Sequence, residues 1–214
     1  RDQGKDVMLM FDSVTRFAKA QREIGLAIGE PPAQRGYTPS VFETMPKLLE
    51  RSGTSKKGSI TAFYTVLVDG DDMDEPIADT VRGILDGHIV LNRKLAQSYH
   101  YPAIDVLQSI SRLANRVSGT ETKKACAGVR RLMAAYKEKE DFISVGAYER
   151  GTSQLVDAAI DTHDAIESFL IQEEFEPSPI EETLKNLGNI VGVTIPEEEL
   201  LQAGYNPEKS ENQN

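Results

Sequence analysis

The feature that most constrains the fold is a short apolar run, Val7 to Phe11, which stops at an acidic residue, Asp12. A continuous apolar run of this length is typical of a strand buried on both faces of a parallel sheet. From Val14 onward apolar residues recur at helical spacing, with Phe17 and Ala18 three and four positions further on. The stretch therefore predicts a buried strand followed at once by a helix, which is an α/β arrangement.

Asp12 lies where the carboxyl end of that strand is expected, and α/β sheets bind their ligands at this edge. In nucleotide-hydrolysing proteins a carboxylate at this place holds Mg²⁺. The alternative is that the side chain of Asp12 only caps the following helix. One carboxylate after an apolar run does not separate these two interpretations.

Charge and composition exclude several classes of protein. The formal net charge is -10, from 34 acidic and 24 basic residues, which argues against a nucleic-acid binder. The single cysteine, Cys126, excludes an intrachain disulfide and fits a reducing cytoplasm, and its helical context favours packing over reactivity. No apolar run approaches the roughly 18 residues that a membrane helix needs. The chain begins with Arg1 rather than Met, which suggests a fragment.

The clearest strand is Ile60 to Val68, whose β-branched and aromatic residues favour a central place in the sheet. It leads into the acidic stretch Asp69 to Glu75, where Met73 occupies a ligand position of the EF-hand pattern. We therefore expect a solvated loop there rather than a calcium site.

Between these strands, Gly25 to Pro39 is predicted to be a long loop rich in Gly and Pro. Ser40 and Glu43 have the spacing of a capping box, which predicts a helix that contains Pro46 and ends at Gly53.

The α/β pattern continues with a predicted helix 78–85, a strand 88–91 and a helix 93–98. From Thr120 onward the sequence pattern predicts helices only. Apolar residues with helical spacing predict core-facing stripes on two helices: Val129, Leu132, Met133 and Tyr136 on the first, and Leu155, Ala159, Ile166 and Phe169 on the second, 153–171. A third helix is predicted to start at Ser178, with Pro179 as its first residue. The three histidines do not have metal-ligand spacing.

Several motifs, in one order, resemble those of the rotary ATP synthase superfamily. They are Phe11-Asp12-Ser13-Val14-Thr15-Arg16, Gly29-Glu30-Pro31-Pro32, Gly36-Tyr37-Thr38-Pro39-Ser40, and Tyr101-Pro102-Ala103-Ile104-Asp105 followed by Ser109-Ile110-Ser111-Arg112. Within this superfamily the sequence is most similar to that of flagellar protein-export ATPases, the motor subunits of flagellar type III secretion. The segments that carry this similarity are Phe63 to Met73, Pro76 to Asp79 and Asp86 to Leu91. The similarity covers residues 1 to about 190.

The resemblance implies an α/β fold: the second half of a RecA-type P-loop ATPase core, a parallel sheet with flanking helices, followed by a C-terminal helical domain. The expected boundaries are 1–118 for the core, 119–203 for the helical domain and 204–214 for a polar, disordered tail. The family's β-barrel domain, phosphate loop and catalytic glutamate precede these motifs, and no Gly-x-x-x-x-Gly-Lys-Ser/Thr occurs in this chain. We therefore expect a C-terminal fragment that is inactive alone.

The resemblance also assigns roles to site residues, with ATP and Mg²⁺ as cofactors. Asp12 would hold Mg²⁺ through bound water, and Arg16 would steady the catalytic carboxylate and the terminal phosphate. The alternative for Arg16 is a surface salt bridge of small energy.

Tyr101 would stack on adenine, with Phe169 and Phe175 completing the pocket, unless these aromatic side chains simply pack in the core. Arg112 would be the arginine finger that enters the neighbouring subunit's site and neutralises charge on the transferring phosphate. Without the resemblance, Arg112 would be interpreted as a solvated arginine at a helix start.

The expected function is that of an ATP-hydrolysing motor subunit that unloads and exports flagellar proteins. The expected partners are its own copies in a homohexamer, stalk and regulatory proteins of the export apparatus, and export chaperones and substrates, without nucleic acid. Its place would be cytoplasmic, peripheral at the inner face of the cell membrane. The loop 146–151 aligns with the stalk-contact region, but its motif differs, so no contact residues carry over.

Four alternatives stay open. The chain is also compatible with a virulence-type secretion ATPase or a rotary ATP synthase subunit. A transcription-termination-type RNA translocase shares the Asp-Ser-x-Thr-Arg strand end, although the net charge and the long helical half argue against it. The helical half from Thr120 would also serve as a docking module without catalysis.

Overall fold

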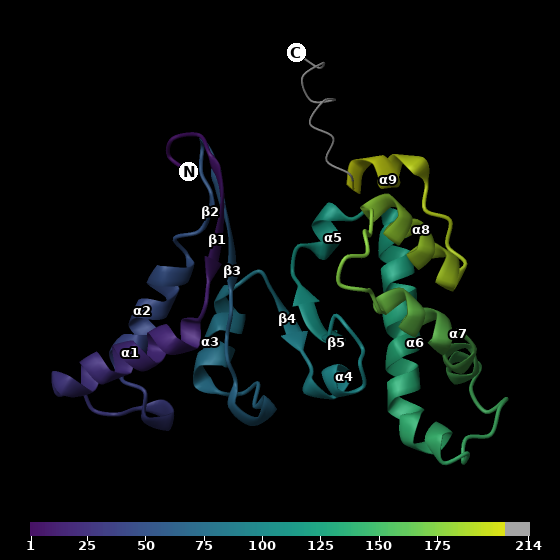
Figure 1. The fold of residues 1–214 in the computed structure, drawn as a ribbon, viewed down its shortest axis with the longest axis horizontal. Coiled ribbons are helices and arrows are strands. Elements are labelled where there is room, and N and C mark those ends of the chain that lie inside the picture. Colours follow the sequence, from purple (N-terminus) through teal and green to yellow (C-terminus); the bar gives the residue numbers. More distant parts are fainter. Residues whose placement is uncertain (204–214) are drawn as a thin grey trace. The chain divides into compact units, whose positions relative to one another are not determined.

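The computed structural model describes residues 1–203, and the predicted tail, 204–214, lies outside the described residues. The chain forms two compact units, the first from Arg1 to Asp86 and the second from Gly87 onward. Figure 1 shows the elements of both units. The boundary predicted after residue 118 stays a prediction about functional domains.

The first unit contains a small sheet and helices. Its elements are β1 (Asp6–Phe11), α1 (Val14–Ala27), η1 (Gln34–Gly36), α2 (Pro39–Leu49), β2 (Gly53–Thr54), β3 (Ser59–Tyr64), η2 (Asp69–Asp71) and α3 (Pro76–Ile84). The strand order is β1-β3-β2, so β3 is central, as predicted. β1 and β3 run parallel, with Asp6 opposite Ser59 and Phe11 opposite Tyr64, whereas β2 is antiparallel to β3.

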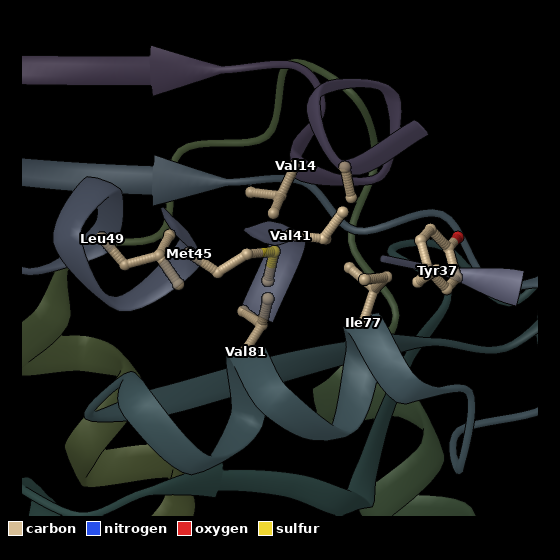
Figure 2. Packing of buried hydrophobic residues seen from close by; sticks show 8 residues of the cluster. Val14, Tyr37, Val41, Met45, Leu49, Ile77 and Val81 are labelled. Atoms are coloured by element: carbon tan, nitrogen blue, oxygen red, sulfur yellow. The ribbon is translucent and has the colours of Figure 1, made fainter. Parts of the chain in front are cut away.

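The core of this unit lies between its three α-helices rather than on the sheet. Figure 2 shows Val14 of α1, Val41 and Met45 of α2, and Ile77 and Val81 of α3 pointing toward one another. All five side chains are buried. This packing fixes the start of α1, and with it the corner that follows β1.

The prediction that β1 is buried on both faces is wrong for this structure. Met8 is 69% exposed and Met10 is 78% exposed. Within the described residues β1 pairs with β3 along one edge, and the helical core reaches the sheet through Phe11 and Tyr64 at the strand ends. An apolar run thus marks a strand correctly without showing which of its faces is covered.

Three predicted boundaries also differ. α1 extends through Gly25, which was expected in a loop, and β3 ends at Tyr64 rather than at residue 68. The capping box is wrong because α2 begins at Pro39, and the backbone N–H of Ser40 donates to the carboxylate of Glu30. A proline at the first helical position needs no N–H partner, so Pro39 starts the helix earlier than the capping box predicts.

The second unit begins with a strand pair and continues with helices. Its elements are β4 (Gly87–Leu91), α4 (Arg93–Gln97), β5 (Ile104–Ser111), α5 (Ala114–Val117), α6 (Thr120–Ser144), α7 (Gln154–Leu170), α8 (Ile180–Val191) and α9 (Glu197–Ala203). β4 and β5 are antiparallel, with an irregular register between His88 and Val90. The α/β character and the change to helices are therefore confirmed.

The long helix α6 is the centre of the helical part, and Figure 1 shows α7 and α8 beside it. The helical part has its own hydrophobic core, here called the second core, which includes the buried residues Ala125, Val129 and Ile166. Leu132, Met133 and Phe169 pack against that core, as their spacing predicted. Cys126 packs there too, and burial raises the pKa of its thiol. The predicted cap of α8 by Ser178 is wrong, because Pro179 occupies the N-cap position and the Ser178 hydroxyl accepts a hydrogen bond from Gln172.

The last described helix is fastened to the first turn of α6. The carboxylate of Glu199 accepts from the backbone N–H groups of Glu121 and Thr122, at 3.0 and 2.9 Å. These backbone bonds lower the pKa of Glu199. Within the described residues, no helix is both long enough and apolar enough to cross a membrane.

Candidate functional site

The first predicted site residue, Asp12, lies directly after β1 and is exposed. The N-cap of α1 is its neighbour Ser13, whose hydroxyl accepts from the N–H of Arg16 at 3.3 Å. The alternative in which Asp12 caps the helix is therefore wrong. One carboxylate oxygen of Asp12 instead accepts from the hydroxyl of Thr65 at 2.6 Å, so the continuation of β3 orients the carboxylate.

The corner that carries Asp12 is held to the segment after β3 by further hydrogen bonds. The buried hydroxyl of Thr15 donates to the carbonyl of Leu67 at 3.1 Å and accepts from the N–H of Leu67 at 2.8 Å. The backbone N–H of Val14 also donates to the carbonyl of Thr65. Thr15 and Thr65 are thus positioning residues that the sequence reasoning missed, although Thr15 belongs to the motif that carried the resemblance.

Arg16 extends from the first turn of α1 into solvent, on the same corner as Asp12. Two predicted site residues are therefore brought together here, a carboxylate at the strand end and a cation one helical turn later. Such a corner offers a carboxylate to a metal ion and a guanidinium to a phosphate group, while the role assigned to each stays a prediction.

The residues of this corner fit a magnesium ion only if another group completes the shell. Within the described residues, no group of three or more His, Cys, Asp or Glu side chains could hold a metal. Mg²⁺ is commonly held by one or two carboxylates together with substrate phosphates and waters. Asp12 fits that arrangement as a single carboxylate ligand.

The aromatic site residues lie in the second unit. Tyr101 is 50% exposed, and its carbonyl accepts from the backbone N–H of Gln172 at 2.8 Å. The side-chain amide of Gln172 in turn donates to the carbonyl of Glu176 at 2.7 Å. Because Gln172 lies between Phe169 and Phe175 in the chain, these bonds bring Tyr101 next to the aromatic segment, 169–175.

The two phenylalanines differ in their surroundings. Phe169 packs against the second core, which agrees with the alternative that it is a core residue. Phe175 is 89% exposed in the connection between α7 and α8. Of the two, Phe175 is therefore the one whose ring is open to a ligand.

Arg112 follows β5 directly and is exposed. The guanidinium of Arg130, on α6, donates to the carbonyls of Ser109 and Leu107 at 3.1 and 3.5 Å, which joins β5 to the long helix. Earlier in β5, burial would raise the pKa of Asp105, but hydrogen bonds from Gln108 and Asn92 outweigh it and lower that pKa. The segment from Tyr101 to Arg112 is thus held both by polar contacts within it and by contacts from Asn92 and Arg130.

The predicted site residues are divided between the two units. Asp12 and Arg16 lie in the first, whereas Tyr101, Arg112 and the two phenylalanines lie in the second. In each unit one of these residues is held by a hydrogen bond from a segment distant in sequence, Asp12 by Thr65 and Tyr101 by Gln172.

Comparison with known proteins gives two consecutive family matches. Residues 1–111 match the nucleotide-binding domain of the ATP synthase alpha/beta family. Residues 118–189 match the C-terminal domain of the type III secretion ATPase EscN.

Individual proteins agree with these matches. The chain is 62% identical over 195 residues to the flagellum-specific ATP synthase of Treponema pallidum, covering 91% of this chain and 44% of that protein. The assembled ATPase EscN of enteropathogenic E. coli superposes with a TM-score of 0.86 at 49% identity, covering 89% of this chain and 46% of that one. EscN in complex with its central stalk EscO gives a TM-score of 0.79 at 48% identity, with 89% and 45% covered.

The chain thus spans less than half the length of each of these proteins. The resemblance to flagellar and type III secretion ATPases, predicted from the motifs, is confirmed. The predicted fold class, an α/β part followed by a helical domain, is confirmed as well.

Proposed function

The chain belongs to the ATP synthase alpha/beta family, and on that premise we propose that it is part of an ATP-hydrolysing motor subunit of a flagellar type III protein-export apparatus. The observation that carries the proposal is the continuation of a nucleotide-binding match, 1–111, into a secretion-type C-terminal match, 118–189. In the full-length protein, ATP hydrolysis would drive the unloading of export substrates from their chaperones.

In this proposal the corner after β1 serves the phosphates of ATP. Asp12, oriented by the hydroxyl of Thr65, would hold Mg²⁺ through bound water, and the ion would neutralise charge on the phosphates. Arg16 would steady the terminal phosphate from the first turn of α1. Rigid placement matters here because catalysis of phosphoryl transfer depends mainly on positioning and electrostatic stabilisation.

The second unit would bind the base and serve a neighbouring subunit. The half-exposed ring of Tyr101 and the exposed ring of Phe175 offer flat faces to adenine, and Phe169 would support the pocket from the core side. Arg112, at the end of β5, would act as an arginine finger in the next subunit's site. A residue that acts on a neighbouring copy requires self-assembly, and from the resemblance to the family we propose a closed ring of six copies, a homohexamer.

The partners proposed for this chain follow its relatives. The similarity to assembled EscN and to its complex with the stalk EscO supports self-assembly and a stalk protein as partner. We further propose that regulatory proteins, chaperones and export substrates are partners. We propose that the motor works at the inner face of the cell membrane. The EscN-type C-terminal match also favours a second candidate, a virulence-type secretion motor. Pull-down of flagellar chaperones by the full-length protein, and not of virulence chaperones, would decide between the two.

Substitution of Tyr101 in the full-length protein tests the base site. Tyr101→Ala should weaken ATP binding by about 1–3 kcal/mol, the contribution of stacking one base on an aromatic ring. Tyr101→Phe should cost little, because stacking needs the face of the ring and not the hydroxyl. Calorimetric titration with ATP measures both. If both variants lose thermal stability and keep their nucleotide affinity, Tyr101 is a packing residue.

Mixed rings test the shared active site. Arg112→Ala should leave ATP binding nearly unchanged and lower hydrolysis by roughly a thousandfold or more. Arg112→Lys should restore little, since an ammonium does not reproduce the planar contact with two oxygens. Subunits with Arg112→Ala and subunits with Asp12→Asn, mixed into one ring, should regain turnover at interfaces where both residues are intact. Mixed rings that form and stay inactive would contradict the proposal.

A further inference from the structure

The residue before Tyr101 is a buried histidine that no role assigned so far uses. His100 is 6% exposed, and its Nδ1 lies 3.1 Å from Oε2 of Glu167, near the end of α7. The two residues are 67 positions apart in the chain. A buried imidazole is costly without a hydrogen-bond partner, so this contact stabilises the place where the segment from 99 to 103 meets α7.

His100 is also fixed through its backbone. Its N–H donates to the carbonyl of Leu95 at 3.0 Å, which joins it to α4. The carbonyl of the next residue, Tyr101, accepts from the N–H of Gln172, two residues beyond the end of α7. Two contacts at consecutive residues therefore fasten Tyr101 to the end of α7, one through a side chain and one through the backbone.

We propose that His100 and Glu167 are a pair of positioning residues that hold Tyr101 beside the aromatic segment, 169–175. The pair acts through Tyr101 and does not touch the nucleotide. A base held between Tyr101 and Phe175 needs both rings at a fixed separation, and α7 sets that separation because it carries Glu167 and leads directly into the aromatic segment. This inference rests on the proposed role of Tyr101 in binding the base.

The proposal predicts a loss of affinity without a loss of chemistry. In the full-length protein, His100→Ala should raise the dissociation constant of ATP about tenfold, the effect of losing one hydrogen bond to a charged group. The kcat at saturating ATP should change less than about twofold, because substrate that is bound still meets an intact catalytic corner. His100→Asn should recover most of the affinity, since its amide nitrogen can occupy the place of Nδ1 and donate to Glu167.

A second variant keeps the test valid if His100→Ala does not fold. Glu167 is partly exposed and helical, so Glu167→Ala should be tolerated, and it should weaken ATP binding as His100→Ala does. The matched control is His163→Ala. That histidine lies on α7, four residues before Glu167, and its ring stacks on Tyr136 of α6 with the ring centroids 3.7 Å apart, so the substitution removes a contact of α7 with α6 instead of the contact with His100. It should change stability and leave the affinity for ATP unaltered.

A double substitution shows whether the pair acts through Tyr101. In a Tyr101→Ala background, His100→Ala should cause no further loss of ATP affinity. The inference is overturned if Glu167→Ala lowers the melting temperature with unchanged affinity, or if His100→Ala weakens binding equally in both backgrounds. Failure of the proposed function looks different, because Tyr101→Ala alone would then leave the affinity for ATP unchanged.

Discussion

Thr15→Val should destabilise the first unit more than any exposed substitution of the same kind. The Thr15 side chain is buried, and its hydroxyl both donates to and accepts from the backbone of Leu67, at 3.1 and 2.8 Å. Valine preserves the shape and removes both bonds, which leaves one N–H and one carbonyl of β3's continuation without this partner. Losing the hydroxyl should cost about 2–3 kcal/mol in the free energy of unfolding.

Two matched variants separate hydrogen bonding from packing. Thr15→Ser keeps the hydroxyl and loses one buried methyl group, which should cost only about 1 kcal/mol. Thr61→Val makes the same chemical change on an exposed position of β3 and should stay within about 0.5 kcal/mol of the original protein.

Urea unfolding followed by circular dichroism gives the three free energies. Hydrogen exchange at the amide of Leu67 adds a local measurement, and it should accelerate in Thr15→Val and stay slow in Thr15→Ser. The reasoning fails if Thr15→Val is no less stable than Thr15→Ser, or if exchange at Leu67 is the same in both. The corner after β1 would then be held by helix packing and by the bonds that Val14 and Asp12 make with Thr65, without a contribution from the Thr15 hydroxyl.

Other regions of the chain give independent predictions. Gly25→Ala should lower the free energy of unfolding by about 1–3 kcal/mol, because the new Cβ would lie 2.4 Å from the Thr38 hydroxyl oxygen. At Gly83 a new Cβ would meet nothing within 4 Å, so Gly83→Ala should raise the free energy of unfolding by about 0.5 kcal/mol. Urea unfolding of the two variants measures both changes. Backbone N–H groups of α6 lower the pKa of Glu199, so this carboxylate stabilises the fold above its unfolded pKa and loses that effect as pH falls through the lower folded pKa. Glu199→Gln should therefore lower the melting temperature at neutral pH and change it little in acid; equal losses at both would refute this. The purified chain of 214 residues should fold without hydrolysing ATP, and magnesium-dependent phosphate release by it would contradict the assignment of the phosphate loop to another part of the protein.

Local patterns in the sequence were sufficient for most elements and for the family. The helix after Asp12 and the apolar stripes of α6 and α7 follow from spacing, because helix periodicity is a property of neighbouring residues. The first strand followed from its apolar run, and the central place of β3 from its β-branched and aromatic residues. The ordered motifs around Arg16 and Arg112 indicated the same family that the comparisons found. The sequence alone thus determined the fold class and the residues worth testing.

The tertiary structure decided which partner each polar group takes. From the sequence, Asp12 is compatible with a role as the cap of α1. In the structure Ser13 caps that helix, and the carboxylate of Asp12 accepts from the hydroxyl of Thr65. Spacing likewise carried no sign that His100 meets Glu167, 67 residues later.

Burial of β1 was misjudged for the same reason, since an apolar strand does not specify what covers it. Contacts between distant segments depend on how helices pack and where loops return, and no short window of sequence contains that information. The chemistry of the site is therefore readable from single residues, whereas its positioning depends on contacts that only the folded chain creates.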